Sequence, residues 1–269
     1  MEILRLRAFT DNYIWSLRHN GLLAVVDPGE SGPVLDHLAQ SGDRLVAILL
    51  THHHDDHIGG LADLVALEDE KNPITVFGPA ANHIPQVNRA LQGGETIVLP
   101  EFGDEGAFQV IAVPGHTLGH LAYYRPGTLF CGDTLFLLGC GRLFEGSPAQ
   151  MWQSLSALAA LPADTQVYCA HEYTYMNLPF ALAVEPGNPQ LQARSVKLKE
   201  KISLGIATVP DTLGDELVTN VFLRPTQPEV IAAARRYRSE TGGDTTLATP
   251  TEVFAALREW RNGYKPPTI

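Results

Sequence analysis

The chain has 269 residues, of which 45% are hydrophobic and 18% are charged, as in an ordinary globular protein with one large or two smaller domains. Its net charge of −11 argues against nucleic acid and anionic membrane surfaces as partners. Three cysteines are too few for a disulfide framework, the apolar runs are too short to span a bilayer, and the first residues lack the order of a signal peptide, so we expect a cytoplasmic protein.

The first segment, residues 2–27, is predicted to form three short strands. The dipeptide Asn20-Gly21 is a strong signal for a hairpin between the second and the third strand. The third strand ends at Asp27, whose carboxylate fits two roles. It either orients a metal-binding histidine or caps the helix predicted over residues 32–40, and the sequence leaves both roles open.

The next segment contains the histidine-rich sequence Thr51-His-His-His-Asp-Asp-His57. It follows an apolar run over residues 45–50, which predicts a buried strand, and it precedes a helix that we expect over residues 59–70. In α/β folds, ligand sites usually lie at such strand ends. The sequence therefore predicts a binding loop, with a solvated histidine-rich loop as the alternative.

Imidazole and carboxylate side chains in this loop are good ligands for divalent transition metals. Alternate residues of a tight loop can point to one side. His52 and His54 are therefore candidates for one metal ion, while Asp56 and His57 are candidates for a second.

Later candidates each follow a predicted strand. They are His116 after the strand at 107–113, Asp133 after the strand at 128–131, and His171 after the strand at 166–170. His116 is a candidate for the third histidine on the first metal, and the two oxygens of Asp133 suit a bridge between two cations. His120 is interpreted as a structural histidine and Cys131 as a buried apolar residue.

Other elements are predicted around these ligands. Strands are expected at 73–77, 96–99 and 121–125, whereas residues 80–95 show no clear pattern. Ser147 followed by Pro148 predicts the start of a helix that continues to about residue 160.

From residue 173 onward the apolar spacing becomes helical. Helices are predicted at 174–183, 189–204, 228–238 and 250–262. We therefore expect a metal-binding domain at residues 1–172 and a helical, substrate-binding domain at 173–269. The first contains 8 Lys/Arg and 20 Asp/Glu and the second 11 Lys/Arg and 10 Asp/Glu, so the second is better suited to an anionic substrate.

Several stretches carry a family resemblance. They are His52-x-His54-x-Asp56-His57 with the later ligand candidates, Asp11-Asn-Tyr-Ile-Trp15, Gly132-Asp-Thr-Leu-Phe136, Gly139-Cys-Gly-Arg-Leu-Phe-Glu-Gly146 and His171-Glu-Tyr-Thr174. The metal motif resembles the metallo-β-lactamase superfamily, and its combination with the helical tail resembles glyoxalase II, the hydroxyacylglutathione hydrolases. The resemblance covers nearly the whole chain. It implies an α/β fold, a four-layer αββα sandwich with a C-terminal helical domain.

The resemblance also implies two divalent metal ions per chain, with zinc expected and iron or manganese as alternatives. By matched position the ligands are His52, His54 and His116 for the first ion, Asp56, His57 and His171 for the second, and Asp133 as the bridge. Asp56 would also orient the metal-bound hydroxide.

The reaction that the resemblance implies is hydrolysis of S-D-lactoylglutathione to D-lactate and glutathione, and we expect a monomer. By matched position the substrate-binding residues are Arg142, Phe144, Tyr173, Arg258 and Arg261. Some family members have Lys in place of Arg142 and Tyr in place of Phe144, so this chain keeps the charge but lacks that hydroxyl. Metal-bound water is a suitable nucleophile for a thioester, and thiolate is a good leaving group.

Two alternatives belong to other functional classes. A persulfide dioxygenase of the same superfamily would use a single iron and oxygen and would not require Arg258 and Arg261. A non-catalytic metal-binding protein would hydrolyse nothing when loaded with metal. Anaerobic turnover of a thioester separates the hydrolase from both.

Overall fold

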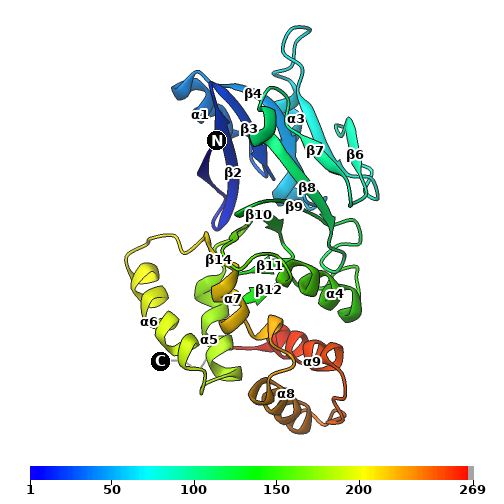
Figure 1. Cartoon of the computed structure of the whole chain (residues 1–269), viewed down its shortest axis with the longest axis vertical. Coiled ribbons are helices and arrows are strands. Elements are labelled where there is room, and N and C mark those ends of the chain that lie inside the picture. The colour runs from blue at the N-terminus through cyan, green and yellow to red at the C-terminus, as the bar shows by residue number, and fades with distance from the viewer. Residues whose placement is uncertain (266–269) are drawn as a thin grey trace.

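The computed structural model describes residues 1–265, in which two β-sheets form the upper part of the molecule in Figure 1 and helices form the lower part. The first sheet has its strands in chain order. They are β1 (Glu2–Ala8), β2 (Asn12–His19), β3 (Leu22–Val26), β4 (Arg44–Leu49), β5 (Thr75–Pro79) and β6 (Arg89–Leu91). β1 to β3 are antiparallel, and β3 to β6 run parallel. The carboxyl ends of β3 and β4, which lead into Asp27 and the histidine-rich loop, therefore lie at one edge.

The second sheet has the strand order β14-β13-β10-β9-β8-β7. Its strands are β7 (Thr96–Val98), β8 (Ala107–Ala112), β9 (Leu121–Arg125), β10 (Thr128–Gly132), β13 (Gln166–Cys169) and β14 (Asp211–Thr212), with a 3-10 turn η1 (Gly103–Gly106) before β8. β10 and β13 run parallel, so Asp133 and His171 follow two neighbouring strands at the same edge. This arrangement explains how ligand candidates that are far apart in sequence meet.

Hydrophobic side chains pack on both faces of the first sheet. Trp15 and Leu49 belong to a cluster that also contains Tyr123 of the second sheet, so this cluster joins the two sheets. On the other face, Val34 of α1 (Gly32–Ser41) and Leu64 of α3 (Leu61–Val65) pack against the strands. The predicted α/β sandwich of two sheets with outer helices is confirmed.

Several predicted elements around the sheets are confirmed. The turn at Asn20 and Gly21 has φ values of 50° and 78°, as the hairpin signal requires. α4 (Pro148–Ala159) begins with a capping box in which the Ser147 and Gln150 side chains bond each other's backbone amides. Met151 of α4 joins the cluster between the sheets, and α4 therefore contributes to the main core.

The helix predicted over residues 59–70 is wrong. The chain instead forms a single turn, α2 (Asp55–Ile58), and then the short α3. Gly59 and Gly60 separate them, and both press against the backbone that follows Asp27: a Cβ on Gly59 would lie 2.5 Å from the Gly29 oxygen, and one on Gly60 would lie 2.4 Å from the Glu30 carbonyl carbon. Asp55, Asp56 and His57, at the end of the histidine-rich sequence, therefore lie in the helical turn α2.

Short elements in three places were not predicted. β6 lies in the segment 80–95, and β11 (Leu135–Phe136) and β12 (Gly139–Cys140) form a small hairpin after β10. In the tail, β14 pairs with β13, so the tail adds an edge strand to the second sheet. Sheet and tail therefore share structure across residue 172.

The helices of the tail pack below the sheets in Figure 1. They are α5 (Thr174–Val184), α6 (Pro189–Ser203), α7 (Leu213–Thr219) with the 3-10 turn η2 (Val221–Leu223), α8 (Pro228–Glu240) and α9 (Pro250–Gly263). α5, α6, α8 and α9 agree with the predicted ranges to within a few residues, whereas α7 was not predicted.

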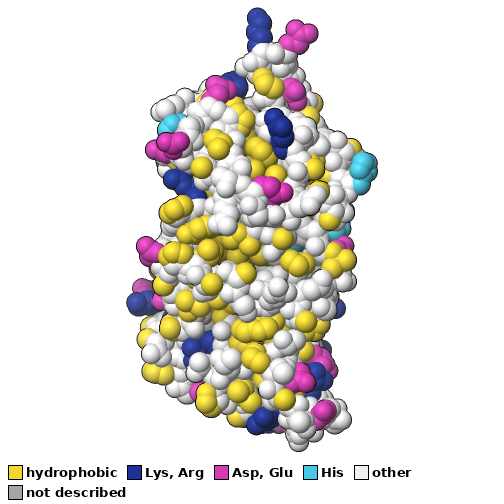
Figure 2. All heavy atoms as spheres, turned by 45° about the vertical axis from the view of Figure 1, so that its right-hand side comes forward, with side chains coloured by type: hydrophobic (Ala, Val, Ile, Leu, Met, Phe, Trp, Pro, Cys, Tyr) yellow, Lys and Arg dark blue, Asp and Glu magenta, His cyan; other side chains and the backbone are white. Residues whose placement is uncertain are grey.

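The face in Figure 2 carries single charges of both signs, and hydrophobic side chains gather across its middle, at the height where sheets and helices meet. Among residues 1–265, no helix combines the length and the apolar character needed to cross a bilayer.

Candidate metal centre

The histidine-rich sequence leaves the end of β4 and is fixed at once by Asp27. The Thr51 backbone amide and hydroxyl each donate a hydrogen bond of 2.7 Å to the Asp27 carboxylate. The second carboxylate oxygen, Oδ2, also lies 3.0 Å from His57 Nδ1. The helix α1 has Ser31 at its N-cap position, so Asp27 does not cap it. Of the two roles that the sequence left open, the structure favours orientation of a histidine.

A first group of ring nitrogens converges at one end of the site. His54 Nδ1 lies 3.1 Å from His52 Nε2 and 3.0 Å from His116 Nε2. Tetrahedral metal–nitrogen bonds of about 2 Å place ligand nitrogens about 3.3 Å apart, so these separations suit one divalent ion. The three residues predicted for the first metal therefore meet in space, and their donor atoms form one of the candidate groups in residues 1–265.

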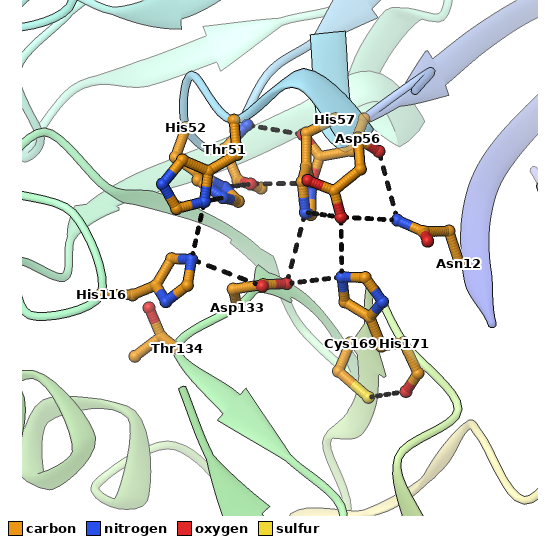
Figure 3. A network of polar contacts seen from close by, with 12 residues as sticks. Asn12, Thr51, His52, Asp56, His57, His116, Asp133, Thr134, Cys169 and His171 are labelled. Atoms are coloured by element: carbon orange, nitrogen blue, oxygen red, sulfur yellow. Dashed lines mark hydrogen bonds and ion pairs between the residues drawn. The ribbon is translucent and has the colours of Figure 1, made fainter. Parts of the chain in front are cut away.

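A second group lies beside the first and combines Asp56, His57 and His171. Asp56 Oδ2 lies 3.6 Å from His57 Nε2 and 3.4 Å from His171 Nε2. In Figure 3, His52, Asp56 and His57 lie on one side of this space, and His116, Asp133 and His171 lie on the other.

Asp133 lies between the two groups. Its Oδ1 is 3.4 Å from His57 Nε2 and 3.3 Å from His171 Nε2, and its Oδ2 is 3.4 Å from His116 Nε2. One carboxylate oxygen thus faces each group, which is the arrangement expected of a bridging ligand.

Fixed acceptors hold the rings of three candidate ligands. His57 Nδ1 faces Asp27, His171 Nδ1 lies 2.9 Å from Asp11 Oδ1, and His116 Nδ1 lies 2.8 Å from the Arg142 carbonyl oxygen. A proton on Nδ1 leaves the lone pair of Nε2 free to bind a metal, and outer hydrogen bonds of this kind orient ligand histidines in metalloproteins.

Burial and carboxylates divide the histidines into two classes. Burial lowers the pKa of His52, His54 and His116 below its ordinary value, so these rings are neutral ligands. Burial also disfavours charge on His57 and His171, but the surrounding carboxylates, Asp133 foremost, together outweigh this effect, and the pKa of His171 rises to about 11. The pKa of Asp133 is lowered, because His171 and His57 outweigh its own burial.

The unsatisfied polar atoms of the site fit a metal. His57 Nε2, His171 Nε2 and Asp133 Oδ1 are buried, and none has a hydrogen-bond partner among the described residues. Buried polar groups without partners are costly, and here three of them face a common space. Neutral imidazoles and carboxylates are the donor set of zinc, iron and manganese sites. The residues present therefore fit divalent metal ions.

Two histidines near the site serve other purposes. His120 is fully buried, its Nε2 accepts a 3.1 Å hydrogen bond from the Asp133 amide, and its ring stacks on His52 at 4.6 Å. This agrees with the structural role predicted for it. His53 Nε2 lies 3.3 Å from Glu145 Oε1, a residue outside the two ligand groups. Cys131 is buried as predicted, and burial raises the pKa of its thiol.

Aromatic and cationic side chains predicted to bind substrate surround the histidines. Phe144 is 61% exposed and meets His54 and His116 edge to face at 5.4 and 5.2 Å. The Arg142 guanidinium lies 5.6 Å from the Phe144 ring centre. Tyr173 stacks on His171 at 4.5 Å. These three residues border the candidate ligands.

The two arginines of α9 lie deeper than a pair of surface cations would. Arg258 is 7% exposed and donates a 2.8 Å hydrogen bond to the Cys140 carbonyl. Arg261 is partly buried and donates to Asn177 Oδ1 at 3.2 Å. Cys140 belongs to the segment that follows Asp133, and the Asn177 side chain bonds the Leu137 carbonyl of the same segment. Through these contacts α9 reaches the metal-binding part of the chain.

The sequence reasoning assigned no role to Asp11, Asn12 or Thr51. Asn12 pairs with His171 in an isolated bridge, and its amide donates to Asp56 Oδ2 at 3.1 Å. This bridge places Asp11 behind His171. The signal available in the sequence was the stretch Asp11-Asn-Tyr-Ile-Trp15, which carried a family resemblance without a chemical role.

Comparisons with known proteins agree with this geometry. Residues 9–76 and 78–171 match the family model of the metallo-beta-lactamase superfamily, and residues 172–264 match the model of the hydroxyacylglutathione hydrolase C-terminus. A hydroxyacylglutathione hydrolase of Dechloromonas aromatica is 48% identical over 272 residues, covering 98% of this chain and 100% of the relative. One of Nitrosomonas europaea is 44% identical over 268 residues, covering 100% of this chain and 98% of the relative.

Solved structures share the fold. ETHE1 from Myxococcus xanthus has a TM-score of 0.63 at 22% identity and covers 97% of this chain and 98% of its own. TTHA1623 in a di-iron-bound form has a TM-score of 0.57 at 25% identity and covers 83% of this chain and 100% of its own. With both family models matched and relatives above 40% identity along its full length, the chain belongs to the hydroxyacylglutathione hydrolases, the glyoxalase II family of the metallo-beta-lactamase superfamily.

Proposed function

We propose that this hydrolase converts S-D-lactoylglutathione and water to D-lactate and glutathione at a centre of two divalent metal ions. One observation carries the binuclear assignment: the two oxygens of Asp133 face two separate groups of ligand atoms. The di-iron-bound form of TTHA1623, a structural relative at 25% identity, supports it.

We assign the ligands by the two groups described above. His52, His54 and His116 hold one ion, Asp56, His57 and His171 hold the other, and Asp133 lies between them. Zinc is the ion we expect, because five of the six terminal ligands are imidazoles and the sixth is a carboxylate, which are ligand types that zinc commonly takes. Iron and manganese accept the same donor set.

The chemistry needs a nucleophile at neutral pH and relief for the charge that develops on the thioester oxygen. When bound, divalent metals lower the pKa of water from about 16 to about 7 and polarise a carbonyl group. The chain contributes orientation: Asn12 holds the Asp56 carboxylate by a 3.1 Å hydrogen bond, so that Asp56 can accept a hydrogen bond from the attacking water. Because thiolate leaves readily, no side chain has to protonate it.

The glutathione part of the substrate needs apolar contact and cations. Phe144 and Tyr173 offer aromatic faces beside the metal ligands, and Arg142 lies next to Phe144. Arg261 on α9 carries a guanidinium that is only partly engaged, with one hydrogen bond to Asn177 among the described residues. We propose that these residues and Arg258 bind the glutathione moiety; Arg258 also donates a hydrogen bond to the Cys140 carbonyl.

We further propose that the chain acts as a monomer in the cytoplasm, with a metal-binding domain at 1–172 and a substrate-binding domain at 173–269. The three cysteines are buried and form no disulfide, as expected of a protein from a reducing compartment.

The test combines turnover with elemental analysis. Protein purified without chelator is expected to contain near two equivalents of zinc, iron and manganese combined, and to hydrolyse S-D-lactoylglutathione without oxygen. One equivalent in fully active protein contradicts the binuclear centre. Oxygen-dependent turnover of glutathione persulfide without thioester hydrolysis identifies a dioxygenase instead, and metal binding without any turnover identifies a non-catalytic protein.

A further inference from the structure

The hairpin of β11 and β12 connects two parts of the candidate metal centre. It begins two residues after Asp133, and it ends two residues before Arg142, whose carbonyl oxygen lies 2.8 Å from His116 Nδ1. The Gly141 amide donates to the Thr134 carbonyl at 3.2 Å and closes the base of the hairpin. A displacement of the hairpin therefore moves both Asp133 and the acceptor that orients His116.

The hairpin has little support of its own. Each strand has two residues, and the turn passes through Leu138 with φ of 58°, a left-handed conformation that is unfavourable for a leucine. Residues 135–140 are buried, so water does not satisfy their backbone groups. Other parts of the chain have to supply the missing hydrogen bonds.

Side chains of the helical tail supply them. Asn220 Nδ2 donates to the Phe136 and Gly139 carbonyls at 3.1 and 2.9 Å. Glu216 Oε2 accepts from the Leu138 amide at 2.8 Å, and Asn177 Nδ2 donates to the Leu137 carbonyl at 3.1 Å. With the bond from Arg258 to the Cys140 carbonyl, every residue from 136 to 140 has a backbone group bonded by the tail.

Glu216 and Asn220 are themselves fixed in a buried network. Both are fully buried, and Asn220 Nδ2 donates to Glu216 Oε2 at 2.9 Å. Arg194 pairs with Glu216 Oε1 at 2.6 Å and with Asp211 at 2.8 Å. Burial raises the pKa of the Glu216 carboxyl, and the paired Arg194 guanidinium opposes this effect. The side chains of the network bond one another, so they present a rigid set of donors and acceptors to the hairpin.

We infer that Asn220 and Glu216 are positioning residues of the metal centre: through the hairpin, they hold Asp133 and the Arg142 carbonyl in the places that metal binding requires. The helical tail then has a role in metal retention in addition to substrate binding. This inference rests on the proposed metal centre.

A matched pair of variants tests it. Asn188 is a second buried asparagine of the tail, and its side chain has the same kinds of partner as Asn220: its Oδ1 accepts backbone amides, and its Nδ2 donates to Glu185 and to the Val218 carbonyl. Neither partner belongs to the hairpin. Asn220→Ser and Asn188→Ser both keep an oxygen that can cap the following turn, and both lose the amide donors.

The measurements are the rate of metal loss from the purified holoenzyme to a chelator and the melting temperature of the metal-free protein. We expect Asn220→Ser to lose metal about tenfold faster than Asn188→Ser. The substitution loosens the Arg142 carbonyl, the outer partner of His116, and loss of such a partner typically weakens metal affinity by about 10–100-fold. The metal-free melting temperatures are expected to fall by similar amounts in both variants. Equal rates of metal loss contradict the inference.

Asn177→Asp is the second variant, and it is decisive if Asn220→Ser does not fold. It preserves shape and the oxygen that accepts from Arg261, but replaces the donor to the Leu137 carbonyl with a repelling oxygen. Faster metal loss than in the wild type supports the inference, and an unchanged rate overturns it. A wild-type protein that holds no metal contradicts the proposed function itself, which separates the two failures.

Discussion

At the scale of single residues, the ring orientation of three candidate ligands is set from outside the metal-binding space. Asp27 and Asp11 are acceptors for His57 and His171, and a backbone carbonyl is the acceptor for His116. A ring held this way cannot turn its Nε2 away without losing a buried hydrogen bond. The centre is therefore organised before metal arrives, which reduces the free-energy cost of assembling it.

The difference between Asp133 and His53 gives a test of this organisation. Asp133→Asn removes the charge that faces both ligand groups, and the expected result is loss of at least one equivalent of metal and most of the activity. His53 contacts Glu145 and not the ligand groups, so His53→Ala should retain metal and rate within a few-fold. Elemental analysis and steady-state kinetics of both variants check this, and equal losses would show that the loop is assigned wrongly.

The candidate ligands could be proposed from the sequence, whereas the residues that support them could not. His116, Asp133 and His171 each follow a strand that the apolar pattern predicts, and a ligand at a strand end is a local signal. The bond between Asp11 and His171 spans 160 residues. Only the pairing of the two sheet edges brings these side chains together, and periodicity in a single sequence holds no information about that pairing.

At the scale of elements, length decided which predictions were correct. The long helices α4, α5, α6, α8 and α9 cover several turns, so their apolar spacing is clear. β11, β12 and β14 have two residues each and no periodicity to detect. The helix expected over 59–70 failed for a different reason: Gly59 and Gly60 serve close backbone contacts to another loop, a tertiary demand that helical spacing does not reveal.

The helix α9 yields a prediction about substrate affinity. Arg261→Ala removes a guanidinium proposed to bind a carboxylate of glutathione, and a charge-assisted hydrogen bond contributes about 1.5–3 kcal/mol. Each 1.4 kcal/mol corresponds to about a factor of ten, so KM for S-D-lactoylglutathione should rise about tenfold or more with little change in kcat.

The control removes a cation that contacts the same helix without reaching the hairpin region. Arg238 of α8 pairs with Glu259 of α9 at 2.7 Å, and Arg238→Ala should leave KM unchanged. A small thioester that lacks glutathione should be insensitive to both substitutions. If Arg261→Ala affects both substrates equally, the arginine does not bind the glutathione part.

At the scale of the whole molecule, the candidate ligands come from both sheets. His52 to His57 follow β4 of the first sheet, whereas His116, Asp133 and His171 follow β8, β10 and β13 of the second. Neither sheet carries a complete set of ligands. Bound metal would therefore link the two layers of the sandwich directly.

Metal removal should accordingly destabilise the entire fold. Binding at free metal concentrations about a thousandfold above Kd adds about 4 kcal/mol, and each kcal/mol shifts the Tm of a chain of 150–250 residues by about 2–4 °C. We expect a chelator to lower the melting temperature on the order of 10 °C and added metal to restore it, as measured by calorimetry. An identical melting curve with and without metal would mean that the ions do not join the sheets.

The supports of the hairpin also impose a sequence of events during protein synthesis. The candidate metal ligands are complete at His171, whereas the hairpin carbonyls and amide are bonded by Asn177, Glu216, Asn220 and Arg258, which the ribosome adds later. A nascent chain of 172 residues therefore carries all the ligands with the hairpin unsupported. Release of nearly the complete polypeptide is needed before the hairpin is held, so we expect firm metal capture to follow translation and not to accompany it.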